Sequence, residues 1–438
     1  MTDILSSLAS WNNILFISLL NSALIFGYIK FNKYNLISAS NFFLLSIWIC
    51  FFVGFVLAFF SNNLLGDYSL SVYQVFITVC LISICLYLYL LVFFAFDVLI
   101  PRKRLVLFKI PNSKLFINIL SSILFITSVL SIFIYVWKNQ GFVLLKSTGY
   151  LDRYEANRGL GLITLLIKMY IPAIILFYLL NPTKSKLLFS LLLAIGFGLL
   201  SYLAMGGYRQ ILIMGVASLI FHRVLHKGIS FFKIVLYSII GVASLYYLAM
   251  LRYNINVDET RLGLLIGFTQ DSLSPFNSFT KIFEYINTTS EYQNFKLFLG
   301  HFQIMIPRIL WEGKPELILN SGNYYTQHVI NYESNLTISP TLAGELYLMR
   351  GFWSLFIGFG LIAVMNVFLE RIVIYYKESN IKSIVQNTFF LVVIFNAFWL
   401  VREGLEVYIY RMLRMYVLFW VFIVLTYFIY FIFKKDNN

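Results

Sequence analysis

The chain has 438 residues, of which 60% are hydrophobic and only 12% charged, and its formal net charge is +14. A soluble globular domain has no need of this much apolar sequence, so the composition excludes that class. Apolar runs of about 20 residues, enough to cross a bilayer, recur from end to end without strand-like alternation. We therefore expect an all-α, polytopic helical membrane protein rather than a β-barrel.

The apolar runs predict about 11 transmembrane helices. In chain order, about eight spans form an N-terminal bundle in residues 1–251, a hydrophilic segment fills residues 252–350, and about three spans form a C-terminal bundle in residues 351–438. The N-terminus has neither a basic segment nor a small-residue cleavage site, so we expect the first span to remain as an anchor. The predicted spans are 13–31, 41–60, 72–98, 116–137, 161–181, 187–205, 210–226, 234–251, 352–369, 385–400 and 415–433.

The loops between these spans fall into two classes by charge. One class contains 17 basic residues against four acidic ones, whereas the other contains 15 of each. Because basic loops stay in the cytoplasm, the first class is predicted to be cytoplasmic. The N-terminus and the segment 252–350 are then external, and the C-terminus is cytoplasmic. The positive charge is a topology signal and not a sign of nucleic-acid binding.

Arginines are concentrated on the predicted external side. Ten of the 14 arginines are there, whereas 13 of the 19 lysines are cytoplasmic. Guanidinium groups bind phosphate oxygens in a forked geometry, so this enrichment indicates a phosphate-bearing ligand at the outer face. Ion pairs with the external acids and with lipid headgroups are the alternative. The external arginines are Arg153, Arg158, Arg209, Arg252, Arg261, Arg308, Arg350, Arg402, Arg411 and Arg414.

A short external turn, MGGYRQ at 205–210, joins two spans. Its paired glycines, Gly206 and Gly207, permit a tight turn. Arg209 then falls at the N-terminal end of the next helix, where free N–H groups and the helix dipole favour an anion. We predict an anion site there, and the alternative is an interfacial arginine whose charge only reaches toward water.

Two other external segments combine arginines with aromatic rings. Arg153 and Arg158 are interleaved with tyrosines in the segment 149–159, where nearby acids could equally pair with them. The segment 252–350 contains IPRILWEGKP at 306–315, preceded by a stretch too short to span the membrane. Aromatic faces can stack on sugar rings while cations hold phosphate. The candidate binding residues of this long segment are Arg252, Arg261, Arg308, Trp311 and Lys314.

A second motif, PTLAGELYLMRGF at 340–352, closes the hydrophilic segment. Its carboxylate, Glu345, follows a turn set by Pro340 and Gly344 and is expected to begin the next span. A carboxylate at the membrane boundary is a candidate base for taking a proton from a substrate hydroxyl. The alternative is an acidic residue that complements a helix N-terminus.

Several catalytic motifs are absent from the sequence. There is no nucleotide-binding glycine-rich loop, no Asp-x-Asp, and no His/Cys spacing typical of a metal site. The three cysteines, Cys50, Cys80 and Cys85, fall within apolar runs and are expected to be core residues. We therefore expect no cofactor and no metal, with arginines neutralising any phosphate leaving group.

Three segments resemble the Wzy-type oligosaccharide repeat-unit polymerases of O-antigen and capsule synthesis. They are GGYR at 206–209 and the two motifs at 306–315 and 340–352. The plan of many spans, one large external segment in the second half and a basic cytoplasmic tail is also similar. The resemblance implies a GT-C-like glycosyltransferase in the cell inner membrane. Such an enzyme transfers a glycan chain from undecaprenyl pyrophosphate onto a lipid-linked repeat unit at the outer (periplasmic) face.

The resemblance also implies roles and partners. Glu345, Arg209 and Arg308 would be catalytic, and no metal would take part. Membrane lipid surrounds such an enzyme, and a chain-length regulator and a flippase would be its partners. The residues expected to bind the lipid-linked oligosaccharide are Arg153, Arg158, Arg252, Arg261, Trp311, Lys314 and Tyr347.

Two other functions stay open at this stage. An O-antigen ligase uses the same donor with a different acceptor, and sequence patterns separate it poorly from a polymerase. A flippase or other transporter would be expected to place charges within its spans, whereas Lys168 is almost the only charge in the middle of a span here. The crowding of charge at one outer face favours a transferase.

Overall fold

The computed structural model describes residues 6–31, 38–65, 70–101, 110–111, 113–146, 155–157, 159–227, 274–306, 310–314, 320–332, 337–373 and 381–435. Throughout these ranges every regular element is a helix and no strand is present. Nine helical segments in them are long and apolar enough to cross a membrane. The predicted class, an all-α polytopic membrane protein, is therefore confirmed.

The nine segments match nine of the 11 predicted spans. The seventh prediction corresponds to α12 (Arg209–Lys227), whose apolar part, Gln210–Ile220, is shorter than a full span. The eighth, 234–251, lies outside the described residues. The matching helices are α2 (Trp11–Phe31), α3 to α4 (Ala39–Leu65), α5 (Val72–Leu99), α6 (Lys114–Lys138), α9 and α10 (Gly161–Lys168, Tyr170–Leu179), α11 (Lys184–Ala204), α19 (Phe352–Val373), α20 (Ile381–Glu403) and α21 (Leu405–Lys435).

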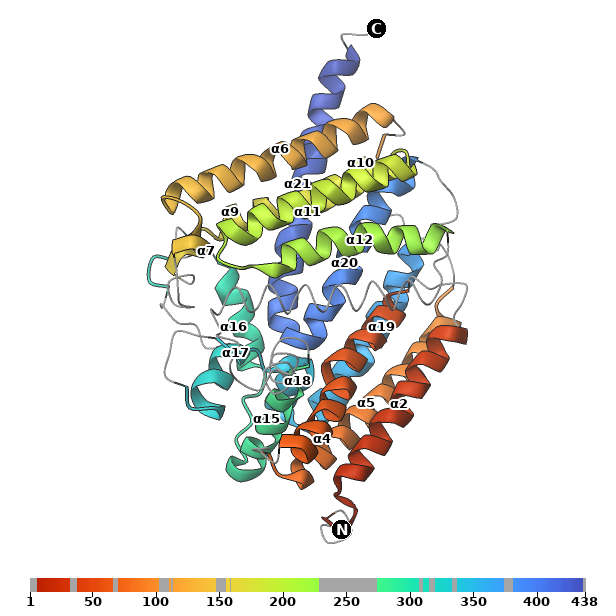
Figure 1. Ribbon diagram of the computed structural model, residues 1–438, viewed down its shortest axis with the longest axis vertical. Helices are drawn as coiled ribbons and strands as arrows, with labels where there is room; N and C mark the ends of the chain where they lie inside the picture. The colour runs from red at the N-terminus through yellow and green to blue at the C-terminus, as the bar shows by residue number, and fades with distance from the viewer. Residues whose placement is uncertain are drawn as a thin grey trace. The chain divides into compact units, whose positions relative to one another are not determined.

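The chain forms two compact units. Unit 1 contains Met1–Lys103, Val257–Arg371 and Asn396–Arg411. Within it α2 packs against α4 and α5, and these helices run alongside one another in Figure 1. Its core is rich in aromatic side chains, including the fully buried Phe43, Phe51 and Phe55.

Unit 2 contains Arg104–Asn256, Ile372–Phe395 and Met412–Asn438. In this unit α10 packs against α6, α11 and α12, and α11 packs along α12; Figure 1 shows these helices stacked side by side. This division describes packing. The partition into bundles at 1–251 and 351–438 around an external segment concerns membrane location, and it stays a prediction.

Local sequence explains where several helices begin and break. Ser38 and Ser71 cap α3 and α5 through side-chain oxygens that accept backbone N–H bonds. The span at 161–179 is interrupted at Met169, between α9 and α10. Pro172 causes this break, because proline has no N–H to donate to the carbonyl of Lys168 and its ring crowds that carbonyl.

The hydrophilic segment 252–350 is helical in its described part, which the sequence did not predict. It contains α15 (Phe276–Thr289), α16 (Lys296–Met305), α17 with the π-helix η3 (Ser321–Tyr324, Tyr325–Val329) and α18 (Thr341–Arg350). α15 packs against α18 and α5. The apolar face of α15, which includes Phe276, Phe279 and Ile282, lies in the core of unit 1. A large part of this segment is therefore folded structure rather than open loop.

Candidate functional site

Charged side chains of unit 1 gather at the turn between α20 and α21. We call residues 399–411 the elbow. α20 ends at Glu403 and α21 begins at Leu405, so a single residue, Gly404, makes the turn. Its φ is +99°, and its N–H donates to Leu400 O at 3.0 Å, which closes the end of α20. Only glycine adopts this backbone conformation without strain.

The Glu345 carboxylate caps the start of α21 from a neighbouring helix. Its Oε2 accepts the N–H of Leu405 at 2.5 Å, and the N–H of Glu406 lies 3.3 Å from Oε1 and 3.4 Å from Oε2. The side chain of Glu345 is fully buried. A Cβ on Gly404 would overlap Glu345 Oε2. The first N–H groups of a helix have no partner within the helix, so a carboxylate placed against them stabilises this end of α21.

Glu345 lies on a separate buried helix and does not begin a span. α18 ends at Arg350, and the φ of +61° at Gly351 interrupts the helical path before α19 starts at Phe352. At the other end, Thr341 has a φ of +66°, and its Oγ1 accepts the N–H of Gly344 at 3.3 Å. A positive φ at a non-glycine residue costs about 1–3 kcal/mol, and this conformation persists only where the surrounding structure enforces it.

Two arginines share one carboxylate and one aromatic ring at the elbow. Arg402 Nη1 lies 3.1 Å from Glu403 Oε1, and Arg411 Nη1 lies 2.8 Å from Glu403 Oε2. The two guanidinium carbons lie 5.6 and 5.3 Å from the centroid of the Trp399 ring, within the range of a cation–π interaction. The arginine side chains are 21% and 20% exposed, so both reach the surface of the protein.

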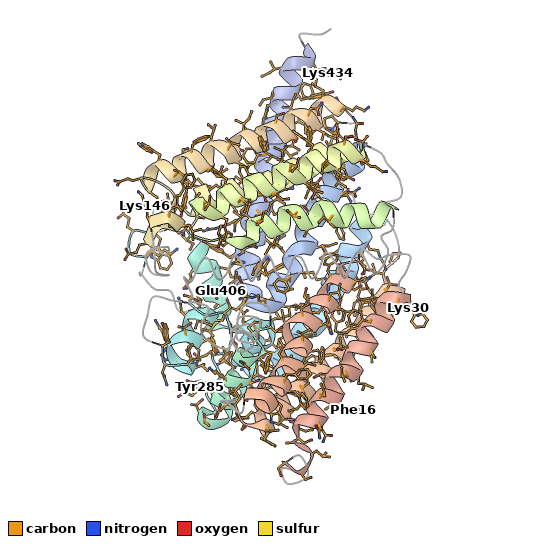
Figure 2. The ribbon with its side chains drawn as sticks, in the orientation of Figure 1. Phe16, Lys30, Lys146, Tyr285, Glu406 and Lys434 are labelled. Atoms are coloured by element: carbon orange, nitrogen blue, oxygen red, sulfur yellow. The ribbon has the colours of Figure 1, made fainter. Side chains whose placement is uncertain are left out.

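The first turn of α21 is also tied to α17. Glu406 Oε2 accepts the hydroxyl of Ser321 at 2.9 Å, and both side chains are buried. Figure 2 labels Glu406 at the start of α21, far along that helix from Lys434 near the C-terminus. Asn320 in turn caps α17 through its side-chain oxygen, which accepts the N–H of Asn323 at 2.7 Å. The elbow is therefore held by α17 and by α18.

The glycine turn of unit 2 has the predicted tight geometry. Gly206 and Gly207 have φ of +67° and +89°, and Gly207 N donates to Tyr202 O at 2.8 Å. The prediction that paired glycines make this turn is confirmed. Lys168 Nζ donates to the Tyr208 hydroxyl at 3.1 Å and lies 5.0 Å from the centre of its ring. Lys168, almost the only charge in the middle of a predicted span, is therefore hydrogen-bonded to the glycine turn through Tyr208.

The described residues locate only some of the other predicted site residues. Arg209 is the first residue of α12, as predicted, but its side chain lies outside the described part. Glu345 belongs to unit 1 and Arg209 to unit 2. Five predicted arginines lie wholly outside the described residues: Arg153, Arg158, Arg252, Arg261 and Arg308.

The remaining predicted binding residues have internal contacts. Trp311 is half-buried, and Lys314 Nζ donates to Ile306 O at 2.8 Å. Tyr347 is buried in the core of unit 1, where its ring lies 5.9 Å from Phe279, 5.6 Å from Phe283 and 5.5 Å from Phe352. These surroundings are those of a core aromatic residue, and a substrate role for Tyr347 stays a prediction.

The elbow residues were not singled out from the sequence. Arg402 and Arg411 were counted only among the external arginines, and Trp399, Glu403 and Glu406 were not considered. The signal was present as REGLE at 402–406 between two apolar runs, with Arg411 nine positions after Arg402. Throughout the described ranges, no group of three or more His, Cys, Asp or Glu side chains could hold a metal ion.

The family model for WzyE protein, O-antigen assembly polymerase, matches residues 7–437, which is nearly the whole chain. No solved structure matches the chain.

Proposed function

This chain belongs to the WzyE family of O-antigen assembly polymerases, and we propose that it joins lipid-linked repeat units into a longer glycan. The family match over residues 7–437 is the observation that supports this most strongly. The helices long enough to span a membrane fit a lipid-borne substrate, because both the enzyme and its substrate then stay in the bilayer.

The proposed reaction is a glycosyl transfer between two polyprenyl-pyrophosphate-linked substrates. A hydroxyl oxygen of the acceptor sugar forms a bond to the anomeric carbon at the reducing end of the donor chain. The bond from that carbon to the pyrophosphate oxygen breaks, so polyprenyl pyrophosphate leaves with the bonding electrons. The hydroxyl proton passes to a base or to water. Stabilising the charge that develops on the pyrophosphate is the main task for the protein.

Among the residues singled out from the sequence, Arg209 and Arg308 are proposed to bind the donor pyrophosphate. Arg209 begins α12, so backbone N–H groups at that helix end would add to its charge. Glu345 was proposed as the base. Its carboxylate accepts backbone N–H groups of Leu405 and Glu406, and this contact favours a positioning role for it. The residues proposed to contact the sugars and phosphates are Arg153, Arg158, Arg252, Arg261 and Trp311.

Reconstitution with one substrate tests the polymerase assignment. Purified protein in vesicles receives a polyprenyl-pyrophosphate-linked repeat unit as the only glycan, in excess EDTA. We expect dimers and longer chains, with one polyprenyl pyrophosphate released for each unit added. A ligase would form no product until a different acceptor is supplied, and a transporter would form no glycosidic bond. Activity that is lost in EDTA and returns with magnesium would contradict the metal-independent reaction.

The proposed location of the site is the outer face of the cytoplasmic membrane, with the N-terminus external and the C-terminus cytoplasmic. A cysteine at Thr288 tests this orientation, because Thr288 is exposed near the end of α15. It should react with an impermeant thiol reagent in intact spheroplasts, over the background of the natural cysteines. Labelling only after lysis would contradict the topology. A chain-length regulator and a flippase are the proposed protein partners.

A further inference from the structure

The geometry of the elbow points to a specific role for two of the ten arginines that the sequence places outside. We propose that Arg402 and Arg411, stacked on Trp399, bind the pyrophosphate of a lipid-linked substrate. We further propose that Glu345 is a positioning residue that holds this pair in place. This inference rests on the proposed function, since the polymerase reaction brings two pyrophosphate groups to the enzyme at once.

The arginine pair has the geometry of an anion site. Both guanidinium groups contact opposite oxygens of one carboxylate, Glu403, at 3.1 and 2.8 Å. Both also lie over the ring of Trp399, at 5.6 and 5.3 Å from its centroid. A planar guanidinium that is stacked on a ring loses less side-chain freedom when it binds phosphate, because its orientation is already restricted.

Three carboxylates lie at the elbow with the two arginines, and each has different contacts. Glu345 and Glu406 both lie at the N-terminal end of α21, where the helix dipole and backbone N–H groups offset their charge. Glu406 also accepts the hydroxyl of Ser321. Glu403 contacts both guanidinium groups. A guanidinium has five N–H donors, so each arginine can donate to a phosphoryl group while it contacts Glu403.

Two guanidinium groups presented together can bind both phosphoryl groups of a pyrophosphate, so a pyrophosphate is the ligand that we infer. Each guanidinium can donate paired N–H bonds to two oxygens of one phosphoryl group. Two of them on one ring can each donate to one of the two phosphoryl groups. Because both arginines are about one-fifth exposed, a ligand can reach them from the protein surface.

Glu345 acts on this pair through the backbone. Its carboxylate holds the N–H groups of Leu405 and Glu406, which follow Gly404 directly. Arg402 and Arg411 lie on either side of that glycine, on two different helices. The distance between the two guanidinium groups therefore depends on the angle of the turn. The absence of a Cβ at Gly404 lets the carboxylate approach this closely.

Binding of a soluble prenyl pyrophosphate tests the site without depending on turnover. The full chain in phosphatidylcholine nanodiscs is titrated with geranyl pyrophosphate by calorimetry, with geranyl monophosphate as the comparison. We expect the pyrophosphate to bind more tightly than the monophosphate. Arg402→Gln and Arg411→Gln should each weaken pyrophosphate binding by about 10- to 100-fold, the range for losing hydrogen bonds to a charged group. Arg402→Lys should weaken it less, because the charge remains and the fork is lost.

Arg350→Gln is the matched control. Arg350 is an exposed arginine of unit 1 that donates to Asn294 Oδ1 at 3.0 Å, outside the elbow. It should change pyrophosphate binding by less than about threefold. Unchanged thermal unfolding of Arg402→Lys shows that its weaker binding is a local effect.

Wild-type affinity for pyrophosphate in folded Arg402→Gln and Arg411→Gln proteins would overturn the proposal, and so would equal wild-type affinity for the monophosphate and the pyrophosphate. A wild-type protein that binds geranyl pyrophosphate through this pair but does not elongate repeat units would instead contradict the proposed function. The two failures are therefore distinguishable.

Discussion

Two clusters of arginine and carboxylate in the described part of unit 1 differ in how exposed their arginines are. At the C-terminal end of α19, Arg371 pairs with Asp97 at 2.7 Å and also donates to the carbonyls of Asp97 and Ile100, at 2.9 and 3.0 Å. It is 3% exposed. Beside it, Glu370 accepts the hydroxyl of Ser40 at 2.6 Å. We call this set the Asp97–Arg371 cluster.

The elbow uses the same residue types in an open arrangement. There two guanidinium groups share one carboxylate, and each is about one-fifth exposed. In the Asp97–Arg371 cluster one guanidinium is surrounded by a carboxylate and two carbonyl oxygens. The difference indicates separate purposes. A buried arginine held by a carboxylate and two carbonyl oxygens joins helices, whereas more accessible paired arginines on an aromatic ring can receive a ligand.

Gly404→Ala should have the largest effect, because it acts on the turn that makes the elbow. Alanine at a φ of +99° is strained, and its Cβ would overlap the Glu345 carboxylate. We expect a loss of more than about 3 kcal/mol of stability together with loss of polymer formation. Unfolding of the purified protein by SDS measures the first effect. Gly27→Ala is the control, since nothing lies within 4 Å of its added Cβ, and it should be close to neutral.

Arg371→Ala tests whether the Asp97–Arg371 cluster is structural. Removing the guanidinium takes one ion pair from Asp97 and a donor from each of two carbonyls, so unfolding in SDS should become easier by roughly 3 kcal/mol. The fraction that remains folded should bind geranyl pyrophosphate with wild-type affinity. Weaker binding by that folded fraction would show that the Asp97–Arg371 cluster contributes to ligand binding, which would contradict a purely structural role.

Glu345→Gln separates the two roles suggested for this residue. If Glu345 is a positioning residue, the glutamine keeps one carbonyl oxygen as an acceptor but loses the negative charge at the N-terminal end of α21. Stability should then fall by about 1–2 kcal/mol, and pyrophosphate binding should weaken. Thermal unfolding and calorimetry measure the two effects. Slow elongation with unchanged unfolding and unchanged binding would identify Glu345 as the base instead.

Trp399→Phe should give the smallest effect. A phenyl ring still offers an aromatic face to Arg402 and Arg411, but it attracts cations less strongly than an indole. The loss should be about 0.5–1 kcal/mol in pyrophosphate binding, with little change in unfolding. Trp399→Ala should weaken binding further. If the alanine variant binds as tightly as the wild type, the ring does not orient the arginines.

The sequence predicted the features that depend on local pattern. Apolar runs located nine spans, and two glycines located the turn before Arg209, because hydropathy and backbone freedom are properties of short segments. It did not predict the elbow. The contact of Glu345 with Leu405 joins residues 60 positions apart, and no local pattern encodes which carboxylate will cap which helix. The helices at 276–350 were missed for a similar reason, since their apolar faces are shorter than a span.

Paired measurements on Arg402→Lys and Arg371→Lys test the central claim most directly. Each variant is reconstituted with lipid-linked repeat units, and its elongation rate and its unfolding in SDS are measured on the same preparation. We predict that Arg402→Lys slows elongation by about tenfold with stability within about 0.5 kcal/mol of wild type. Arg371→Lys should lower stability while its folded fraction elongates normally. Normal elongation by Arg402→Lys, with slow elongation by folded Arg371→Lys, would contradict the division of roles between the two clusters.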